Sequence, residues 1–98
     1  MTVRHTDKKL ERMEYEQAYY AGFSANLVTM YRKRMQFIRA AADERDFYNL
    51  KSPHYEKLKG KRQHQRSMRL NDQFRLILEI HSDASGKLAV IVSLDDYH

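Results

Sequence analysis

Cysteine is absent from the sequence, which excludes a disulfide framework, a thiolate nucleophile and a cysteine-based metal site. No apolar run approaches the roughly 20 residues that cross a membrane, and the first residues lack the apolar stretch of a signal peptide. Internal repeats, low-complexity tracts and linkers are also missing. A chain of 98 residues with these properties predicts a single domain, residues 1–98, and a cytoplasmic location.

Basic residues outnumber acidic ones, with 18 Lys and Arg against 13 Asp and Glu and a net charge of +5. This balance favours a polyanionic partner: nucleic acid first, acidic proteins or a membrane surface second. The excess is concentrated between positions 57 and 69, where no acidic residue occurs. The cations of this basic segment are Lys57, Lys59, Lys61, Arg62, Arg66 and Arg69.

The first half of the chain predicts a short edge strand over Val3 to His5, followed by two helices. Thr6 is a suitable N-cap for the first helix, which is expected to end near Tyr20. Ser24 is a suitable N-cap for the second, longer helix, which is expected to end near Ala42. Because the connection between them is short, we expect two antiparallel neighbours, an αα-hairpin.

The second half begins with a break at Pro53 and a loop from Lys57 onward. Apolar and polar residues then alternate with the period of a β-strand, which predicts a three-stranded antiparallel meander. The strands are expected at 67–70, 73–80 and 88–94, with a turn at Asn71-Asp72 and a longer loop from His81 to Lys87.

The predicted fold class is α+β, with the N-terminal strand and the αα-hairpin packed on a curved antiparallel sheet. The helices should cover one face of that sheet. Alternation assigns the opposite face to Arg69, Arg75 and Ser93, so two arginines of neighbouring strands share it. The core residues predicted under the helices are Phe74, Leu76, Leu78, Val90 and Val92.

Arg75 lies within an apolar strand, where its guanidinium must reach either water on an exposed face or an anion. The planar guanidinium matches the non-bridging oxygens of a phosphate. Lys59, in Leu58-Lys59-Gly60, can neutralise the charge that develops on a pentacoordinate phosphate, or remain a solvated loop side chain. His54 and His64 lie in or beside the same loop and are candidates for proton transfer near neutral pH.

The sequence closes with Asp95-Asp96-Tyr97-His98, which either fray as polar terminal residues or form a catalytic group. RNA cleavage through the 2′-hydroxyl needs a base, an acid and cations on the phosphate. The chain supplies each type without a cofactor. We do not predict a metal site, because no His-x-x-x-His pattern or carboxylate cluster accompanies these residues.

Three short motifs together carry a resemblance to a known family. The order Leu58-Lys59-Gly60, then Phe74-Arg75-Leu76, then Asp96-Tyr97-His98 resembles the HigB branch of the RelE/ParE toxin superfamily. The expected strand–helix–helix–strand–strand–strand order is similar to the fold of that superfamily. The resemblance implies a ribosome-dependent mRNA endoribonuclease that uses no cofactor or metal. It also implies a HigA-like antitoxin with a helix-turn-helix.

The resemblance also implies roles for individual residues. Lys59 and Arg75 would stabilise the scissile phosphate, and Asp96, Tyr97 and His98 would position the RNA and transfer protons. Where relatives commonly have a histidine, three residues before Lys59, this sequence has Glu56. Either Glu56 or the nearby His54 could then act as the base. The RNA-binding residues are predicted to be Lys57, Lys61, Arg62, Arg66 and Arg69.

Two other functions remain open at this stage. A toxin of the ParE type would share the fold but inhibit DNA gyrase without any catalysis, and would not need the polar cluster beside Arg75. A plain RNA-binding module would need aromatic side chains exposed on the sheet for base stacking. The predicted strand register turns Phe74 toward the core, which argues against a plain RNA-binding module.

Overall fold

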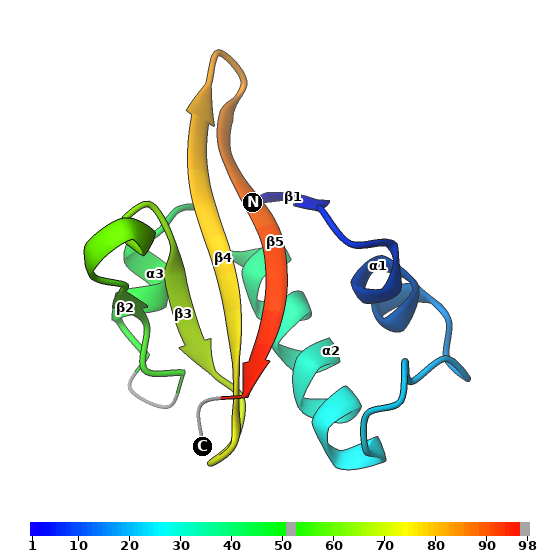
Figure 1. The fold of residues 1–98 in the computed structure, drawn as a ribbon. Coiled ribbons are helices and arrows are strands. Elements are labelled where there is room, and N and C mark those ends of the chain that lie inside the picture. Colours follow the sequence, from blue (N-terminus) through cyan, green and yellow to red (C-terminus); the bar gives the residue numbers. More distant parts are fainter. Residues whose placement is uncertain (51–52, 97–98) are drawn as a thin grey trace.

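The computed structural model describes residues 1–50 and 53–96 and has the predicted α+β architecture (Figure 1). A five-stranded sheet is combined with three helices and one turn of 3₁₀ helix. The elements are β1 (Thr2–His5), α1 (Lys8–Tyr15), α2 (Ala25–Ala40), α3 (Arg45–Tyr48), β2 (Glu56–Lys57), the 3₁₀ turn (Gly60–Arg62), β3 (Arg66–Arg69), β4 (Phe74–Asp83) and β5 (Gly86–Asp96).

The strands lie in the order β1-β5-β4-β3-β2. The predicted antiparallel meander of β3, β4 and β5 is confirmed, and so is the N-terminal edge strand, which pairs in parallel with β5. The basic segment was predicted to be a loop from Lys57 onward. This prediction was wrong for Lys57, which belongs to a strand. Glu56 and Lys57 instead pair antiparallel with Ser67 and Arg66, which adds a short strand at the far edge.

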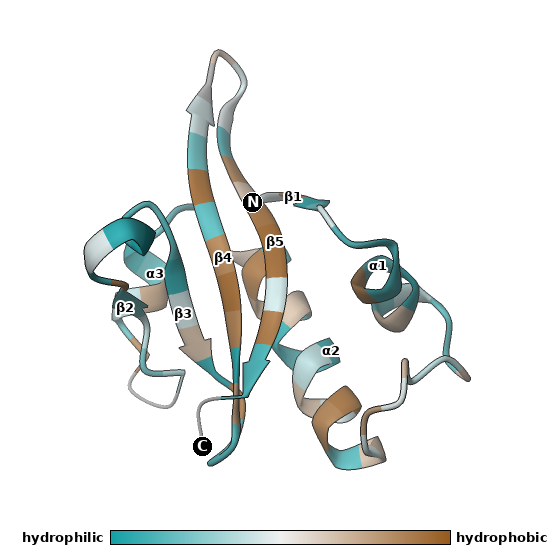
Figure 2. Cartoon of the chain, in the orientation of Figure 1, coloured by the Kyte–Doolittle hydropathy of each residue, from teal (hydrophilic) through white to brown (hydrophobic). Residues whose placement is uncertain are grey.

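The core lies between α2 and one face of the sheet. Figure 2 shows hydrophobic residues concentrated in α2 and in the middle of β4 and β5, whereas the segment around β2 is mostly hydrophilic. Among the helices formed by the described residues, none is long and apolar enough to cross a membrane. The largest fully buried core side chains include Tyr31, Phe47, Met13, Leu27, Met35, Ile38, Met68, Leu76, Leu78 and Ile91.

Helix α1 differs from the prediction at both ends. Its N-cap is Asp7, which accepts a hydrogen bond from the Lys9 amide, while the Thr6 hydroxyl donates to β5 carbonyls instead. The helix ends at Tyr15 rather than near Tyr20. Arg32 of α2 explains the early end. The last carbonyls of a helix have no partner within the helix, and the Arg32 guanidinium donates to carbonyls that follow Arg12. Those carbonyls belong to Met13, Glu16, Gln17 and Tyr19.

Helix α2 begins as predicted: Ser24 is its N-cap and accepts a hydrogen bond from the Leu27 amide at 3.2 Å. It ends at Ala40, slightly before the expected position. The predicted packing of the two helices on each other is confirmed by contacts between α1 and α2, among them a hydrogen bond from the buried Tyr31 hydroxyl to the Leu10 carbonyl at 2.9 Å. The connection between them is longer than predicted and runs from Glu16 to Ser24.

A β-bulge in β5 overturns part of the predicted core. Ile77 pairs with Ser93 and Leu78 with Ile91, so Val92 is an extra residue between them. The bulge inverts the alternation before it: Ala89 and Ile91 join the core under the helices. Val90 and Val92, predicted to lie there, do not belong to that core, and Val90 pairs with Glu79 on the opposite face.

The predicted loop from His81 to Lys87 is mostly strand. The β4–β5 pairing continues through His81–Leu88 and Ser82–Lys87 to a two-residue turn at Ala84-Ser85. The resulting hairpin projects beyond the rest of the sheet (Figure 1), so polar side chains can point to solvent from both of its faces. A polar strand of this kind lacks the apolar alternation from which strands are predicted.

Candidate active site

The face of the sheet opposite the helices carries a row of charged side chains. Arg69 and Arg75 are directly paired across β3 and β4, and Arg75 is paired in turn with Asp95 on β5. The prediction that both arginines share this open face is therefore confirmed. Two residues along β3 from Arg69, Ser67 is paired with Glu56, so the Glu56 side chain belongs to the same face.

These side chains surround a pocket of about 200 Å³, lined by His54, Glu56, Ser67, Arg69 and Arg75. We call it the arginine pocket. His54 Nε2 lies 3.5 Å from Glu56 Oε1, and both side chains are more than half exposed, at 64% and 59%. The pocket thus places a carboxylate and an imidazole, two groups able to accept a proton, beside two guanidinium groups.

Backbone contacts fix His54 at the edge of this pocket. The amide of Arg69 donates to the Pro53 carbonyl, which extends the pairing beside β3 past the end of β2. His54 itself has φ of 51°, a left-handed conformation that is unfavourable for a residue with a side chain. On the Arg69 side, Arg34 of α2 donates to the Arg69 carbonyl at 3.1 Å, and burial lowers the pKa of Arg34.

Of the two adjacent aspartates, it is Asp95 that shares the open face with Arg75. Its carboxylate accepts hydrogen bonds from Arg62 at 3.0 Å and from the Ser93 hydroxyl at 2.8 Å. Asp96 is paired with Phe74, which packs against the core on the helix side. The Asp96 carboxylate accepts a hydrogen bond from the side-chain amide of Gln73. The structure therefore does not bring Asp96 to the arginine pocket.

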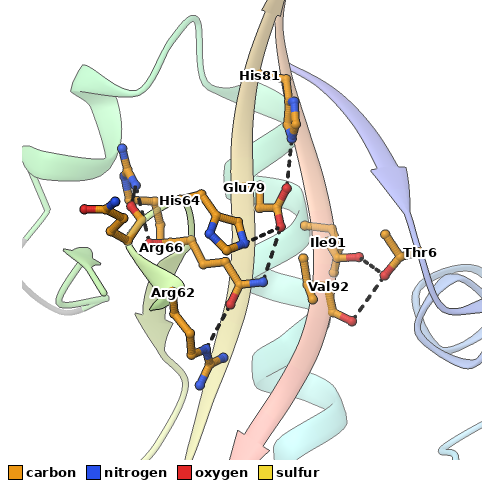
Figure 3. A network of polar contacts seen from close by, with 10 residues as sticks. Thr6, Arg62, His64, Arg66, Glu79, His81, Ile91 and Val92 are labelled. Carbon is orange, nitrogen blue, oxygen red and sulfur yellow. Dashed lines mark hydrogen bonds and ion pairs between the residues drawn. The ribbon is translucent and has the colours of Figure 1, made fainter. Parts of the chain in front are cut away.

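Figure 3 shows Arg62 and His64 beside β4, with His64 directed toward Glu79. Arg62 also bonds Gln65, which donates to Glu79, and Glu79 lies 3.0 Å from His81 and 3.7 Å from His64. The hydrogen bond with His81 is the main cause that lowers the pKa of Glu79. The network places His64 on Glu79, away from the residues that line the arginine pocket.

The predicted RNA-binding cations divide into two groups. Lys57, Lys59 and Lys61 are exposed, and Lys59 is not among the described residues that line the arginine pocket. The arginines are each paired with an acid. The pairs are Arg62–Asp95, Arg66–Glu44 and Arg69–Asp72.

The remaining predicted site residues, Tyr97 and His98, lie outside the described residues. Within the described part of the chain, no group of three or more histidine and acidic side chains is arranged to hold a metal ion. Two features in or beside the pocket were missed from the sequence. One is the buried Ser67, which lines the pocket, and the other is Asp95, which pairs with Arg75 but is not among the residues that line the pocket.

The fold is that of the YoeB and ParE class of bacterial toxins. It is similar to a YoeB/ParE toxin from Agrobacterium tumefaciens, with 14% sequence identity, a TM-score of 0.67 and full coverage of both chains. It is also similar to a chain of the YoeB–YefM complex from Staphylococcus aureus, with 19% identity, a TM-score of 0.60 and coverage of 100% of this chain and 97% of that one.

Within that class, the chain belongs to the HigB-like toxin family. Residues 3–98 match the family described as RelE-like toxin of type II toxin–antitoxin system HigB. Among proteins with curated descriptions, none matches the sequence. The family membership confirms the resemblance drawn from the three sequence motifs.

Proposed function

We propose that this toxin is an mRNA endoribonuclease that acts on the ribosome without a metal ion, with the arginine pocket as its active site. The observation that carries the proposal is the make-up of that pocket. In about 200 Å³ it combines two guanidinium groups with a carboxylate and an imidazole 3.5 Å apart. Guanidinium groups bind phosphate oxygens, and the other two groups can accept the proton of a ribose hydroxyl.

The proposed reaction is attack of the RNA 2′-oxygen on the adjacent phosphorus. Glu56 or His54 accepts the hydroxyl proton as the bond from the 2′-oxygen to phosphorus forms. The bond from phosphorus to the 5′-oxygen then breaks, and that oxygen takes up a proton. The products are a 2′,3′-cyclic phosphate and a free 5′-hydroxyl. Following the family resemblance, His98 is the proposed proton donor, and Asp96 and Tyr97 position the RNA.

Arg69 and Arg75 would stabilise the negative charge of the pentacoordinate phosphate. Their direct pairing on neighbouring strands holds the two guanidinium groups on one rigid surface, which suits stabilisation of charge that develops during the reaction. We assign Lys59 a supporting role in neutralising the same charge, as the resemblance implies. Lys57 and Lys61 are exposed beside it and would contact ribosomal or messenger RNA backbone.

The proposed setting is a cytoplasmic toxin–antitoxin module. Family membership supports an antitoxin partner, and the structurally similar YoeB chain was solved in a complex with YefM. For this chain we propose a HigA-like antitoxin with a helix-turn-helix. The type of antitoxin follows from the resemblance to the HigB branch.

The test adds the purified chain to ribosomes that are translating a defined message, with the free message as control, and maps cuts by primer extension. We expect cuts only in the ribosome-bound message, and none with Arg75→Ala. Lys33→Gln, which removes one exposed positive charge on α2, serves as the matched control and should cut normally. Absence of cuts in both samples with folded protein would overturn the proposal and favour the gyrase-inhibiting alternative, which a supercoiling assay would examine.

A further inference from the structure

A second pocket adjoins the arginine pocket and shares His54 with it. Its volume is about 290 Å³, and it is lined by Tyr48, Leu50, His54 and Tyr55. We call it the tyrosine pocket. Tyr48 and Leu50 are 59% and 46% exposed, so aromatic and aliphatic surface faces solvent next to the predicted phosphate site. We propose that the tyrosine pocket binds one nucleobase of the RNA strand whose phosphate occupies the arginine pocket, an inference that rests on the proposed function.

Tyr55 forms a fixed wall of this pocket. It is buried, its ring packs on Phe47 at 5.2 Å, and its hydroxyl donates to Glu44 Oε2 at 2.7 Å. Arg66 holds the same carboxylate, with 3.3 Å between its Nε and Glu44 Oε2. Burial raises the pKa of Tyr55, so the phenol stays neutral and keeps donating. Arg66, which is predicted to bind RNA, also contributes to the position of Tyr55 through this carboxylate.

Tyr48 and Tyr55 together form a corner that suits a flat ring. Their centroids are 4.8 Å apart and their planes meet at 77°, so a planar ring stacked on one tyrosine presents its edge to the other. Both arrangements are favourable for aromatic groups. Because every nucleobase has an aromatic face, stacking of this kind binds bases with little preference for sequence.

The shared His54 is the reason for choosing a nucleobase as the occupant. It lines both pockets, so a ligand in the tyrosine pocket is in direct reach of a group bound by Arg69 and Arg75. A nucleotide carries an aromatic ring and a phosphate joined through one ribose, and therefore matches both pockets at once. An apolar peptide segment would fit the tyrosine pocket but has no phosphate group to place beside Arg69 and Arg75.

The experiment uses a trinucleotide of 2′-O-methyl adenosines, which cannot be cleaved because the attacking oxygen is blocked. Three further versions each lack one base. Their affinities for the full chain are measured by NMR titration, which also reports ring-current shifts on Tyr48 and on the base protons. We expect one abasic version to bind about tenfold more weakly, the effect of losing one stacked base.

Variants of Tyr48 assign that loss to the tyrosine pocket. Tyr48→Ala should bind the complete trinucleotide about tenfold more weakly and no longer distinguish the abasic version, while Tyr48→Trp should retain the distinction. Tyr20→Ala removes another exposed tyrosine (40%) from the loop between α1 and α2 and should change nothing. Thermal melts verify that each variant is folded.

The outcomes separate this inference from the proposed function. Equal binding of all abasic versions, with affinity still reduced by Arg75→Gln, would overturn the base site and leave the phosphate site standing. A trinucleotide affinity that responds to neither Arg75→Gln nor Tyr48→Ala would overturn both. If Tyr48→Ala left RNA affinity unchanged and weakened only the complex with the antitoxin, the pocket would be an antitoxin contact and the inference would be wrong.

Discussion

Replacement of Arg69 by glutamine should remove most cleavage and leave the fold nearly unchanged. In the folded chain Arg69 lies directly opposite Arg75, and like charges in such cross-strand pairs destabilise a sheet by about 0.2–1 kcal/mol. Arg69 also pairs with Asp72, but the two side chains are 47% and 89% exposed. An exposed pair of this kind stabilises by about 0–1 kcal/mol. The two effects nearly cancel, so the free energy of unfolding should change by less than about 1 kcal/mol.

The effect on catalysis should be much larger. Removal of one preorganised donor to a developing oxyanion lowers the rate constant by about 10²- to 10³-fold, or roughly 3–4 kcal/mol of transition-state stabilisation. Arg69→Lys should restore only part of the rate, because an ammonium group lacks the planar pair of donors that matches a phosphate. Activity and stability are therefore expected to respond very differently to the same substitution.

The assay pairs single-turnover cleavage of message on translating ribosomes with urea unfolding of the same preparations. Lys33→Gln again controls for the loss of one positive charge. Cleavage by Arg69→Gln within about threefold of the parent would refute a contact between Arg69 and the phosphate, given the effect expected for such a donor. A loss of unfolding free energy above about 2 kcal/mol would refute the cancellation of the two pair terms.

Three further measurements test other parts of the structure. Arg62 and Arg66 of the basic segment are paired with acids, so the proposed phosphate contacts are Lys57, Lys59, Lys61, Arg69 and Arg75. For five such contacts, binding of single-stranded RNA should show a log–log salt slope near about −3.5, and a slope near about −5 would instead indicate that Arg62 and Arg66 bind phosphates as well. The depressed pKa of Glu79 contributes stability that is present above its ordinary value of 4.5 and lost as the pH falls through the lower folded value. The free energy of unfolding, measured in urea, should therefore decrease below about pH 4.5. Glu79→Gln should make this decrease smaller. Glu14 is 9% exposed and lies 2.9 Å from the buried His5 and 2.6 Å from Arg39, which is 36% exposed. Glu14→Ala should lower the free energy of unfolding by about 1–3 kcal/mol, because it removes the hydrogen-bond acceptor of these groups, and a loss under about 0.5 kcal/mol would contradict this.

Local signals predicted most of the fold, and the errors occurred where tertiary contacts decide. The Ser24 cap needs only its own amide neighbours and was found. The end of α1 depends on Arg32, which is distant in sequence and takes the terminal carbonyls. The bulge at Val92 lies in an unbroken run of apolar residues, where no residue type indicates that the alternation changes. Val90 was therefore assigned to the wrong face.

The same distinction applies to the site. Arg69 and Arg75 lie on strands with regular alternation, and their shared face was predicted correctly. Alternation from Ser93 also places Asp95 on that face, but the prediction followed the family motif and named Asp96 as the site residue. The position of His54 follows from the contact between Pro53 and Arg69 and from a left-handed backbone. The corner formed by Tyr48 and Tyr55 joins two segments in three dimensions, and the sequence contains no local signal for it.

Glu56 stands where the family resemblance implies a histidine, and this position provides a direct test of which group is the base. Imidazole loses its proton at a higher pH than a carboxyl group does. If Glu56 accepts the 2′-hydroxyl proton, Glu56→His should remain active and move the acidic limb of the cleavage-rate profile to higher pH. If His54 is the base, Glu56→His should leave the acidic limb of the profile in place, and His54→Gln should abolish that limb. The side chain at position 56 is 59% exposed, so the exchange should not disturb packing, and unfolding in urea provides the control. A pH profile that neither substitution changes would show that neither residue accepts the proton. The proposal that the arginine pocket contains the general base would then be wrong.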